Sequence, residues 1–175
     1  MTIARVLAVA AVLTTSALGF AGSAQADQVM QGVYRYDQGD IHTQWTIYPS
    51  CVPTVGDLRD NLELPVACRL HVTPASPAVA GGDARLTGGK WMFSTNVKDG
   101  LTCPDGSTAP IQETYQFDDV TMTGTRSVSN GNACDNEVGA KIVKSSFTLA
   151  FAAPLPIPND QYPLYCEPGG LKRCF

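Results

Sequence analysis

Cysteine is the residue type in this chain with the clearest chemistry. Six cysteines occur, and all of them lie downstream of an apolar N-terminal segment: Cys51, Cys68, Cys103, Cys134, Cys166 and Cys174. An even number of cysteines in a short exported chain predicts a disulfide framework, because thiols oxidise outside the cytoplasm. Zinc sites instead show cysteines paired a few residues apart, and redox sites show a C-x-x-C motif. Neither spacing occurs here, so we expect structural disulfides, no metal and no cofactor.

Proximity along the sequence gives one pairing of these cysteines. It joins Cys51 to Cys68, Cys103 to Cys134, and Cys166 to Cys174. Other connectivities stay open, because spacing alone does not determine which cysteines meet. In a meander of strands each pair would bridge turns or strand ends that already lie close together. The third bridge would close a proline-rich tail, residues 154–175.

Groups that could transfer protons are few. The two histidines, His42 and His71, fall in expected strands, where a solvated or hydrogen-bonded histidine is more common than a catalytic base. Asp118 and Asp119 suggest a carboxylate pair, but adjacent residues of a strand point to opposite faces and Asp-Asp is common in turns. No serine nucleophile elbow and no HExxH motif occurs. We therefore assign no catalytic residue.

A group of tyrosines is the remaining functional signal. Tyr34, Tyr36 and Tyr48 would form a binding platform if they were exposed, and Tyr162 and Tyr165 are further candidates on the tail. The competing interpretation is that aromatic residues at strand spacing fill the core. It applies to Trp45, Trp91, Phe93, Tyr115, Phe117, Phe147 and Phe151.

The N-terminus has the form of a secretory signal peptide. Arg5 precedes an apolar run over residues 6–20, and Ala24 and Ala26 provide the small residues that signal peptidase recognises. The run is shorter than the roughly 20 residues that span a bilayer as a helix. We expect cleavage after Ala26, a mature chain without a transmembrane segment, and an extracellular protein that is either free or associated with the cell envelope.

Composition limits the partners and the domain count. The net charge is −4 and the basic residues are scattered, which argues against nucleic acid as a partner. The chain that follows residues 1–26 has the usual length of one domain. We assign residues 27–153 to that domain and residues 154–175 to the tail.

Alternation of apolar and polar residues predicts an all-β fold. Turn residues separate the alternating segments, and Gly88-Gly89 favours a tight hairpin. A turn or two of helix is possible only over residues 54–62. We expect a single antiparallel sandwich or barrel-like meander of about seven to eight strands, over residues 31–37, 43–48, 66–73, 84–87, 90–97, 112–117, 120–127 and 138–151.

Several short motifs resemble the small exported proteins of mycobacteria and related actinobacteria. They include Gly32-Val33-Tyr34, Trp45-Thr46-Ile47, Gly88-Gly89-Lys90-Trp91, Thr102-Cys103-Pro104-Asp105-Gly106-Ser107, Tyr115-Gln116-Phe117-Asp118, Thr123-Gly124-Thr125 and Phe147-Thr148-Leu149, together with Cys51, Cys68 and Cys134. The resemblance covers about Gly32 to Leu149. It implies a secreted, disulfide-bridged β domain and assigns no catalytic residue. The segment between Cys51 and Cys68 and the cysteine-closed tail depart from the pattern.

Two classes of function remain. The first is a non-enzymatic secreted module that binds a small ligand, or an envelope or host protein, through a sheet face, a loop or the tail. The second is a secreted hydrolase or inhibitor-like protein whose site is assembled from distant residues, with His42 or His71 as candidates. A shared cleft that holds a histidine, a carboxylate and a hydroxyl would favour the enzyme.

Overall fold

Eight strands follow one another in the computed structural model, which describes residues 29–51 and 68–161. Each strand after β1 pairs antiparallel with the strand before it. The strands are β1 (Gly32–Gln38), β2 (Ile41–Cys51), β3 (Cys68–Pro74), β4 (Gly82–Thr87), β5 (Lys90–Thr102), β6 (Thr108–Asp118), β7 (Thr123–Asn130) and β8 (Lys141–Ala153). The expected all-β meander is confirmed, and it is a barrel rather than a sandwich.

Pairing between the first and last strands closes the barrel. In β1, Tyr36 lies opposite Leu149 of β8, and the strand order runs from β1 to β8 without a crossover. The β4–β5 hairpin turns through Gly88 and Gly89, whose φ angles are 59° and 77°. Two successive positive φ angles are the backbone of the tight turn that the Gly-Gly sequence predicts. No helix that could cross a membrane occurs among the described residues, and the segment 54–62 lies outside them.

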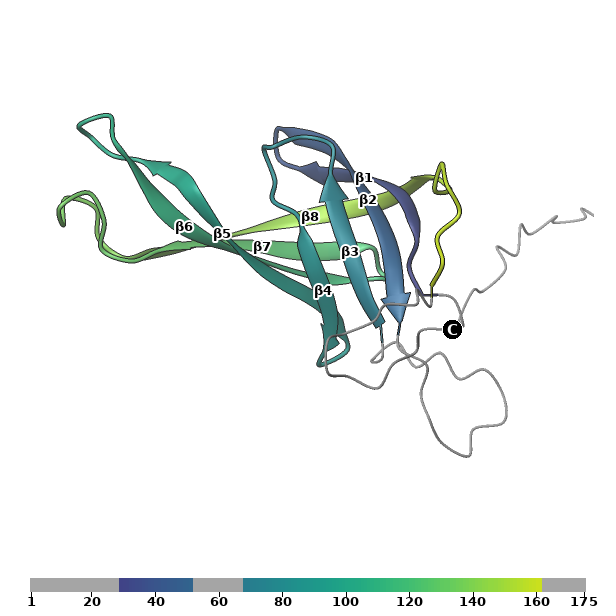
Figure 1. Cartoon of the computed structure of the whole chain (residues 1–175). Helices are drawn as coiled ribbons and strands as arrows, with labels where there is room; N and C mark the ends of the chain where they lie inside the picture. The colour runs from purple at the N-terminus through teal and green to yellow at the C-terminus, as the bar shows by residue number, and fades with distance from the viewer. Residues whose placement is uncertain (1–28, 52–67, 162–175) are drawn as a thin grey trace, which may run out of the picture.

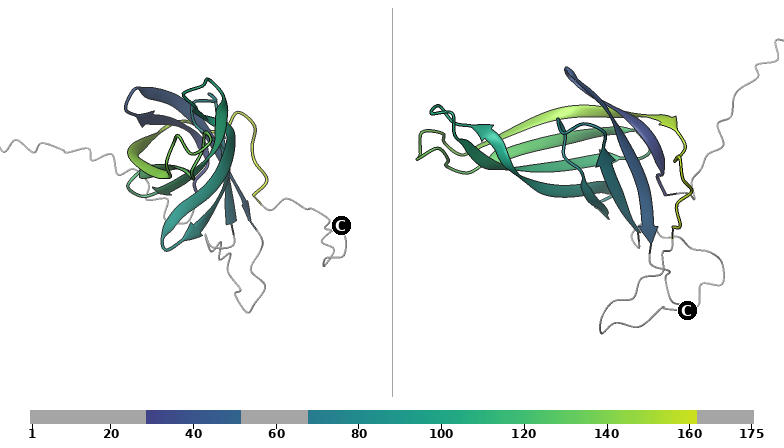
Figure 2. Two further views of the ribbon diagram at one scale, coloured as in Figure 1. Left: turned by 90° about the vertical axis from the view of Figure 1, so that its left-hand side faces the viewer. Right: turned by 45° about the horizontal axis from the view of Figure 1, so that its top comes forward.

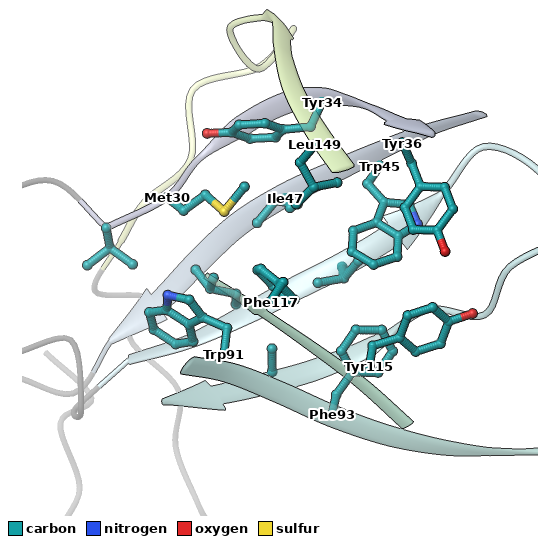
Figure 3. Packing of buried hydrophobic residues seen from close by; sticks show 14 of the residues in the cluster. Met30, Tyr34, Tyr36, Trp45, Ile47, Trp91, Phe93, Tyr115, Phe117 and Leu149 are labelled. Atoms are coloured by element: carbon teal, nitrogen blue, oxygen red, sulfur yellow. The ribbon is translucent and has the colours of Figure 1, made fainter. Parts of the chain in front are cut away.

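Aromatic side chains fill the barrel (Figure 3). Trp45 lies at the centre, with its ring 4.7 Å from that of Tyr36, 5.5 Å from that of Tyr115 and 5.3 Å from that of Phe147. Eight strands enclose just enough space for such side chains. The predicted core residues are buried with one exception, since Phe151 is 59% exposed. It lies at the end of the barrel, edge-to-face with Tyr34, where the β1–β8 register shifts.

The last two strands each begin three residues later than the sequence predicts, and for β7 the cause is visible. Val120 was expected in the return strand after Asp118, yet it is 87% exposed and β7 starts at Thr123. The reason is local, because Asp118 Oδ1 accepts hydrogen bonds from the N–H groups of Val120 (2.9 Å) and Thr121 (2.8 Å). A carboxylate that binds the backbone two and three residues ahead stabilises a turn instead of an extended strand.

The strands β5 to β8 are longer than the barrel needs, and they project from one end of it (Figures 1 and 2). Pairing between β6 and β7 ends at Gln112 and Ser129, so beyond that pair the projection divides into two hairpin arms. We call residues 96–112 the first arm, residues 129–142 the second arm, and the two together the finger. On the two outer sides of the projection, β5 beyond Met92 and β8 before Thr148 pair with no outer strand of the described chain.

Both disulfides of the described chain follow the predicted pairing. Cys51 bonds to Cys68, its register partner across β2 and β3, and Cys103 bonds to Cys134 between the tips of the two arms. Cys166 and Cys174 lie outside the described residues. The start of the predicted tail returns to the barrel, where the N–H of Cys51 donates to the Gln161 carbonyl (2.7 Å).

Candidate functional site

The two arms of the finger are held together at their tips. Cys103 directly follows β5, the outgoing strand of the first arm, and Cys134 lies in the loop between β7 and β8. Cys134, Asp135 and Asn136 have φ angles of 56°, 53° and 70°. Consecutive left-handed residues other than glycine are uncommon and cost energy, which surrounding contacts must offset. A hydrogen bond from Glu137 N to the Cys134 carbonyl (2.9 Å) and the disulfide hold this loop in place.

An open cleft of about 560 Å³ lies where the arms diverge. Its lining comes from both arms and consists of Asn96, Pro110, Ile111, Gln112, Ser129, Asn130, Gly131, Ala140, Lys141 and Ile142. A second hollow continues from it toward the disulfide, since Pro110 and Gly131 line both and Cys134 lines the second. The cleft therefore runs from the fork of the arms to their linked tips.

The cleft offers amide groups that the fold does not use. Asn96 and Gln112 are register partners on β5 and β6, and neither side chain makes a hydrogen bond to another described residue. Asn130, by contrast, donates to the carbonyls of Gly131 (2.7 Å) and Gly139 (3.0 Å), and Asn132 accepts from Ala140 N (3.1 Å). The second pair of amides builds the loop. The first pair remains available to a ligand that both donates and accepts hydrogen bonds.

An apolar contact adjoins these amides. Ile142 lies opposite Ser129 on the second arm and is 67% exposed, although isoleucine is among the residue types most often buried. Lys141 is the charged residue of the cleft lining. An amide pair, an exposed isoleucine and one cation suit recognition of a polypeptide surface better than acid–base chemistry.

Comparison of the chain with protein-family models, with curated proteins and with solved structures finds no match.

A buried polar cluster lies at the end of the barrel from which the finger projects. Glu113 is 3% exposed, and it accepts hydrogen bonds from Arg126 Nη2 and from the Tyr115 hydroxyl. Arg126 also lies over the Tyr115 ring, 5.7 Å from its centroid, and donates to Gln38 Oε1 (3.5 Å). Ala80 N donates to the Tyr115 hydroxyl (3.0 Å), so the loop between β3 and β4 covers the cluster.

Burial shifts the protonation of this cluster. Desolvation is the main cause that raises the pKa values of Tyr36 and Tyr115 well above their ordinary value, so both hydroxyls stay protonated and donate. Desolvation is the largest single effect on the pKa of Arg126 and lowers it. The hydrogen bond to Glu113 and the electrostatic interactions with Tyr115, Glu113 and Tyr36 together outweigh desolvation, so the pKa is raised. The two hydroxyls and the guanidinium therefore each hold one protonation state near neutral pH. The cluster joins the finger to the barrel as a fixed structural element.

The sequence prediction missed Glu113 and Arg126, although a signal existed. Glu113 has the same strand parity as Tyr115 and Phe117, so alternation alone places it on the inner face. A carboxylate on an apolar face needs a partner, because burying an unpaired charge is costly. Arg126 supplies that partner from the neighbouring strand.

The two histidines lie on the outside of the barrel, each in contact with a different aspartate. His42 Nδ1 is 2.8 Å from Asp37 Oδ1, and Arg35 Nε donates to the other oxygen of that carboxylate (2.8 Å). The hydrogen bond from Arg35, followed by that from His42, lowers the pKa of Asp37. His71 Nδ1 is 2.7 Å from Asp83 Oδ1. Neither histidine lines the cleft, and neither is hydrogen-bonded to a hydroxyl or thiol of a described residue.

The expected tyrosine platform is wrong for two of its members. Tyr34 and Tyr36 are buried because their side chains lie on the face of β1 that points into the barrel. Burial raises the pKa of Tyr34 to about 12. Tyr48 has the opposite orientation on β2, where its ring stacks on His71 with 4.9 Å between centroids. Tyr162 and Tyr165 lie outside the described residues.

The adjacent carboxylates of Asp118 and Asp119 act separately. Asp118 holds the turn before β7, and these backbone hydrogen bonds lower its pKa. Asp119 accepts a hydrogen bond from Trp91 Nε1 (3.0 Å), which anchors the turn to a core residue. Within residues 29–51 and 68–161, histidine, cysteine and carboxylate side chains form no group of three that could hold a metal ion.

Proposed function

We propose that this chain is an exported, non-enzymatic binding module, and that its finger recognises a protein of the cell envelope or of a host. The observation that carries the proposal is the cleft between two disulfide-linked arms, with its available Asn96 and Gln112 amides beside exposed Ile142. Binding residues commonly lie on projecting segments that a rigid scaffold positions. Here the packed barrel is the scaffold.

Export is the second part of the proposal. It rests on the signal-like sequence of residues 1–26 and on the resemblance to exported actinobacterial proteins. The disulfides Cys51–Cys68 and Cys103–Cys134 agree with an oxidising compartment, because cytosolic thiols are kept reduced. The Cys103–Cys134 disulfide, which requires oxidation, also links the two arms that form the cleft.

Site-specific crosslinking tests the proposed site. A photoreactive amino acid replaces Gln112 in the cleft in one variant, and exposed Arg85 of β4 in a matched control. Each oxidised protein is incubated with envelope fractions or host extracellular proteins, and the captured protein is identified and purified. We expect capture through position 112 and much weaker capture through position 85.

Affinity for the purified partner then tests the chemistry. Gln112→Arg should weaken binding about tenfold or more, since it puts a bulky charge in the cleft, while Arg85→Gln should leave binding unchanged. Equal capture at the two positions, or full affinity of the Gln112→Arg variant, would contradict a binding site on the finger.

A further inference from the structure

The two outer sheet edges of the projection, on β5 and on β8, differ in regularity. On β5, pairing with β4 ends at Met92, and a register shift between Val97 and Leu101 interrupts the strand beyond it. Bulges of this kind are a common way of blocking an exposed edge. On β8, pairing with β1 begins only at Thr148, and the pairing with β7 runs without a shift. We call residues 141–146 the β8 edge.

The β8 edge presents unpaired backbone groups in a regular row. Leu149 N donates to the Met122 carbonyl on the β7 side. Because successive residues of a strand direct their N–H and C=O groups to opposite sides, Ile142, Lys144 and Ser146 direct theirs away from β7. No strand of the described chain lies on that side. These residues form a template on which another extended segment can pair.

The side chains of the β8 edge have a symmetrical pattern. Ile142 and Val143 are 67% and 44% exposed, and the exposed Lys141 and Lys144 lie on either side of them. The register partners of the two lysines on β7 are neutral, Asn130 for Lys141 and Ser127 for Lys144. Neither lysine forms an ion pair with a described residue. The edge therefore carries two uncompensated positive charges around an apolar pair.

This pattern disfavours a second copy of the chain as the occupant. In an antiparallel pair of β8 edges, residues that direct their backbone groups outward lie opposite each other, so the apolar register is the one that places Ile142 opposite Ile142. That register puts the Lys141 side chains of the two copies at diagonal positions on one face of the sheet. Long side chains reach their diagonal neighbours, so the like charges of the two lysines disfavour this pairing. Edge lysines are a known protection against self-association, and they leave the edge open to a segment of opposite charge.

We infer that the β8 edge binds an extended segment of a partner protein by strand addition, and that this segment has the order acidic, apolar, apolar, acidic. Such a segment sets its carboxylates opposite Lys141 and Lys144 and its apolar residues opposite Ile142 and Val143. The order is the same in both directions, so these side chains fit a parallel or an antiparallel partner. The inference rests on the proposed function of the finger and names the kind of partner it takes.

A synthetic peptide tests the inference directly. The probe is a short peptide with blocked ends and a Glu-Val-Val-Glu centre between threonines, and the control probe has a Lys-Val-Val-Lys centre. Each is titrated into the oxidised, isotope-labelled mature protein. We expect the acidic probe to shift the amide signals of Ile142, Lys144 and Ser146 and to slow their hydrogen exchange. The basic probe should bind about tenfold more weakly or worse, since two attractive charge pairs become repulsive.

Two variants at one position separate backbone pairing from charge. Lys144→Pro removes an N–H that the barrel does not use, and proline is tolerated on such an edge, so folding is retained while binding is lost. Lys144→Gln keeps the N–H and loses one charge, so it should weaken binding severalfold without abolishing it. Circular dichroism and denaturant unfolding of both variants verify the fold.

Several outcomes would overturn the inference. Binding that survives Lys144→Pro, shifts confined to the cleft around Asn96 and Gln112, or equal binding of the two probes would each reject strand addition. So would dimerisation through β8 in analytical ultracentrifugation. If the partner captured through position 112 binds the Lys144→Pro variant normally, strand addition fails while the proposed function stands. If no partner is captured but the acidic probe binds, the proposed cleft fails instead.

Discussion

Glu113 and Arg126 form an ion pair inside the barrel, on neighbouring strands and at diagonal register positions. Glu113 lies opposite Val128, while Arg126 lies opposite Tyr115, so the two side chains reach across one strand spacing. The Tyr115 hydroxyl donates a hydrogen bond to the other oxygen of the Glu113 carboxylate. The pair lies close to where β5 to β8 leave the barrel, and it joins the finger to the core.

Removing one partner of this pair should destabilise the protein strongly. Glu113→Gln leaves the Arg126 charge buried without its counter-ion, and we expect a loss of about 3–5 kcal/mol in the free energy of unfolding. The double variant Glu113→Gln/Arg126→Met should recover part of that loss, because it removes both charges. Denaturant unfolding measures the three proteins. A double variant less stable than Glu113→Gln would contradict the account.

A methyl group at Gly124 should be costly. A Cβ there would lie 2.2 Å from Phe147 Cζ, and Phe147 is fixed by its packing on Trp45 and Tyr36. We expect Gly124→Ala to lower stability by about 1–3 kcal/mol through overpacking. Gly139→Ala is the matched control, because nothing lies within 4 Å of its Cβ position. Thermal unfolding compares the two, and an equal effect would refute the steric explanation.

Loss of the Cys103–Cys134 bond should loosen the finger while the barrel stays folded. The bond closes a loop with a sequence separation of 31 residues, for which chain entropy predicts about 3–4 kcal/mol. Cys103→Ser/Cys134→Ser should raise hydrogen exchange in residues 96–112 and 129–142 and leave core amides such as that of Trp45 protected. Faster exchange throughout the barrel would show that the arms do not open independently.

The turn before β7 should contribute to stability in a pH-dependent manner. Hydrogen bonds from the N–H groups of Thr121 and Val120 lower the pKa of Asp118 below its ordinary value of 3.8. Because the folded-state pKa is the lower one, the stabilisation is present above the unfolded-state pKa and is lost as the pH falls through the folded-state pKa. Asp118→Asn should therefore be less stable than the wild type at neutral pH, with a difference that shrinks in acid.

Urea titrations at a series of pH values measure this difference. A gap between Asp118→Asn and wild type that is constant with pH would mean that the charge of Asp118 does not support the turn.

Export can be tested on the full chain. Expressed in a secreting bacterial host, the protein should be recovered outside the cytoplasm with Asp27 as its first residue, as N-terminal sequencing or mass spectrometry would show. Replacing Ala24 and Ala26 by bulky residues should block processing. Retention of the intact chain in the cytoplasm would reject the export proposal.

Alternation along the chain was sufficient to predict the strands and most of the core. It places Trp45, Tyr115 and Phe117 inside, and the structure confirms these positions. It failed at Phe151, where the barrel ends, and at Val120, where a side chain binds the backbone. At both positions the alternation of residue types is the same as in a buried strand, so it could not predict that these side chains are exposed.

The candidate site was beyond the reach of sequence patterns. Asn96, Gln112 and Ile142 are far apart in the chain and belong to no motif, and they meet because β5 to β8 extend beyond the other strands. Tyr34 and Tyr36 lie in a strand as predicted, but their side chains point into the barrel and are buried.

Proximity along the chain proposed the pairing of Cys51 with Cys68 and of Cys103 with Cys134 without excluding other connectivities, and the structure selected it. The sequence by itself determined the all-β class and the turns at its Gly-Gly and Asp-Asp pairs. These features depend on neighbours along the chain, whose geometry local residue types control. Only the tertiary structure decided that the sheet closes on itself and leaves the β8 edge uncovered. Both depend on which distant strands pair and where their pairing ends, and no local pattern carries that information.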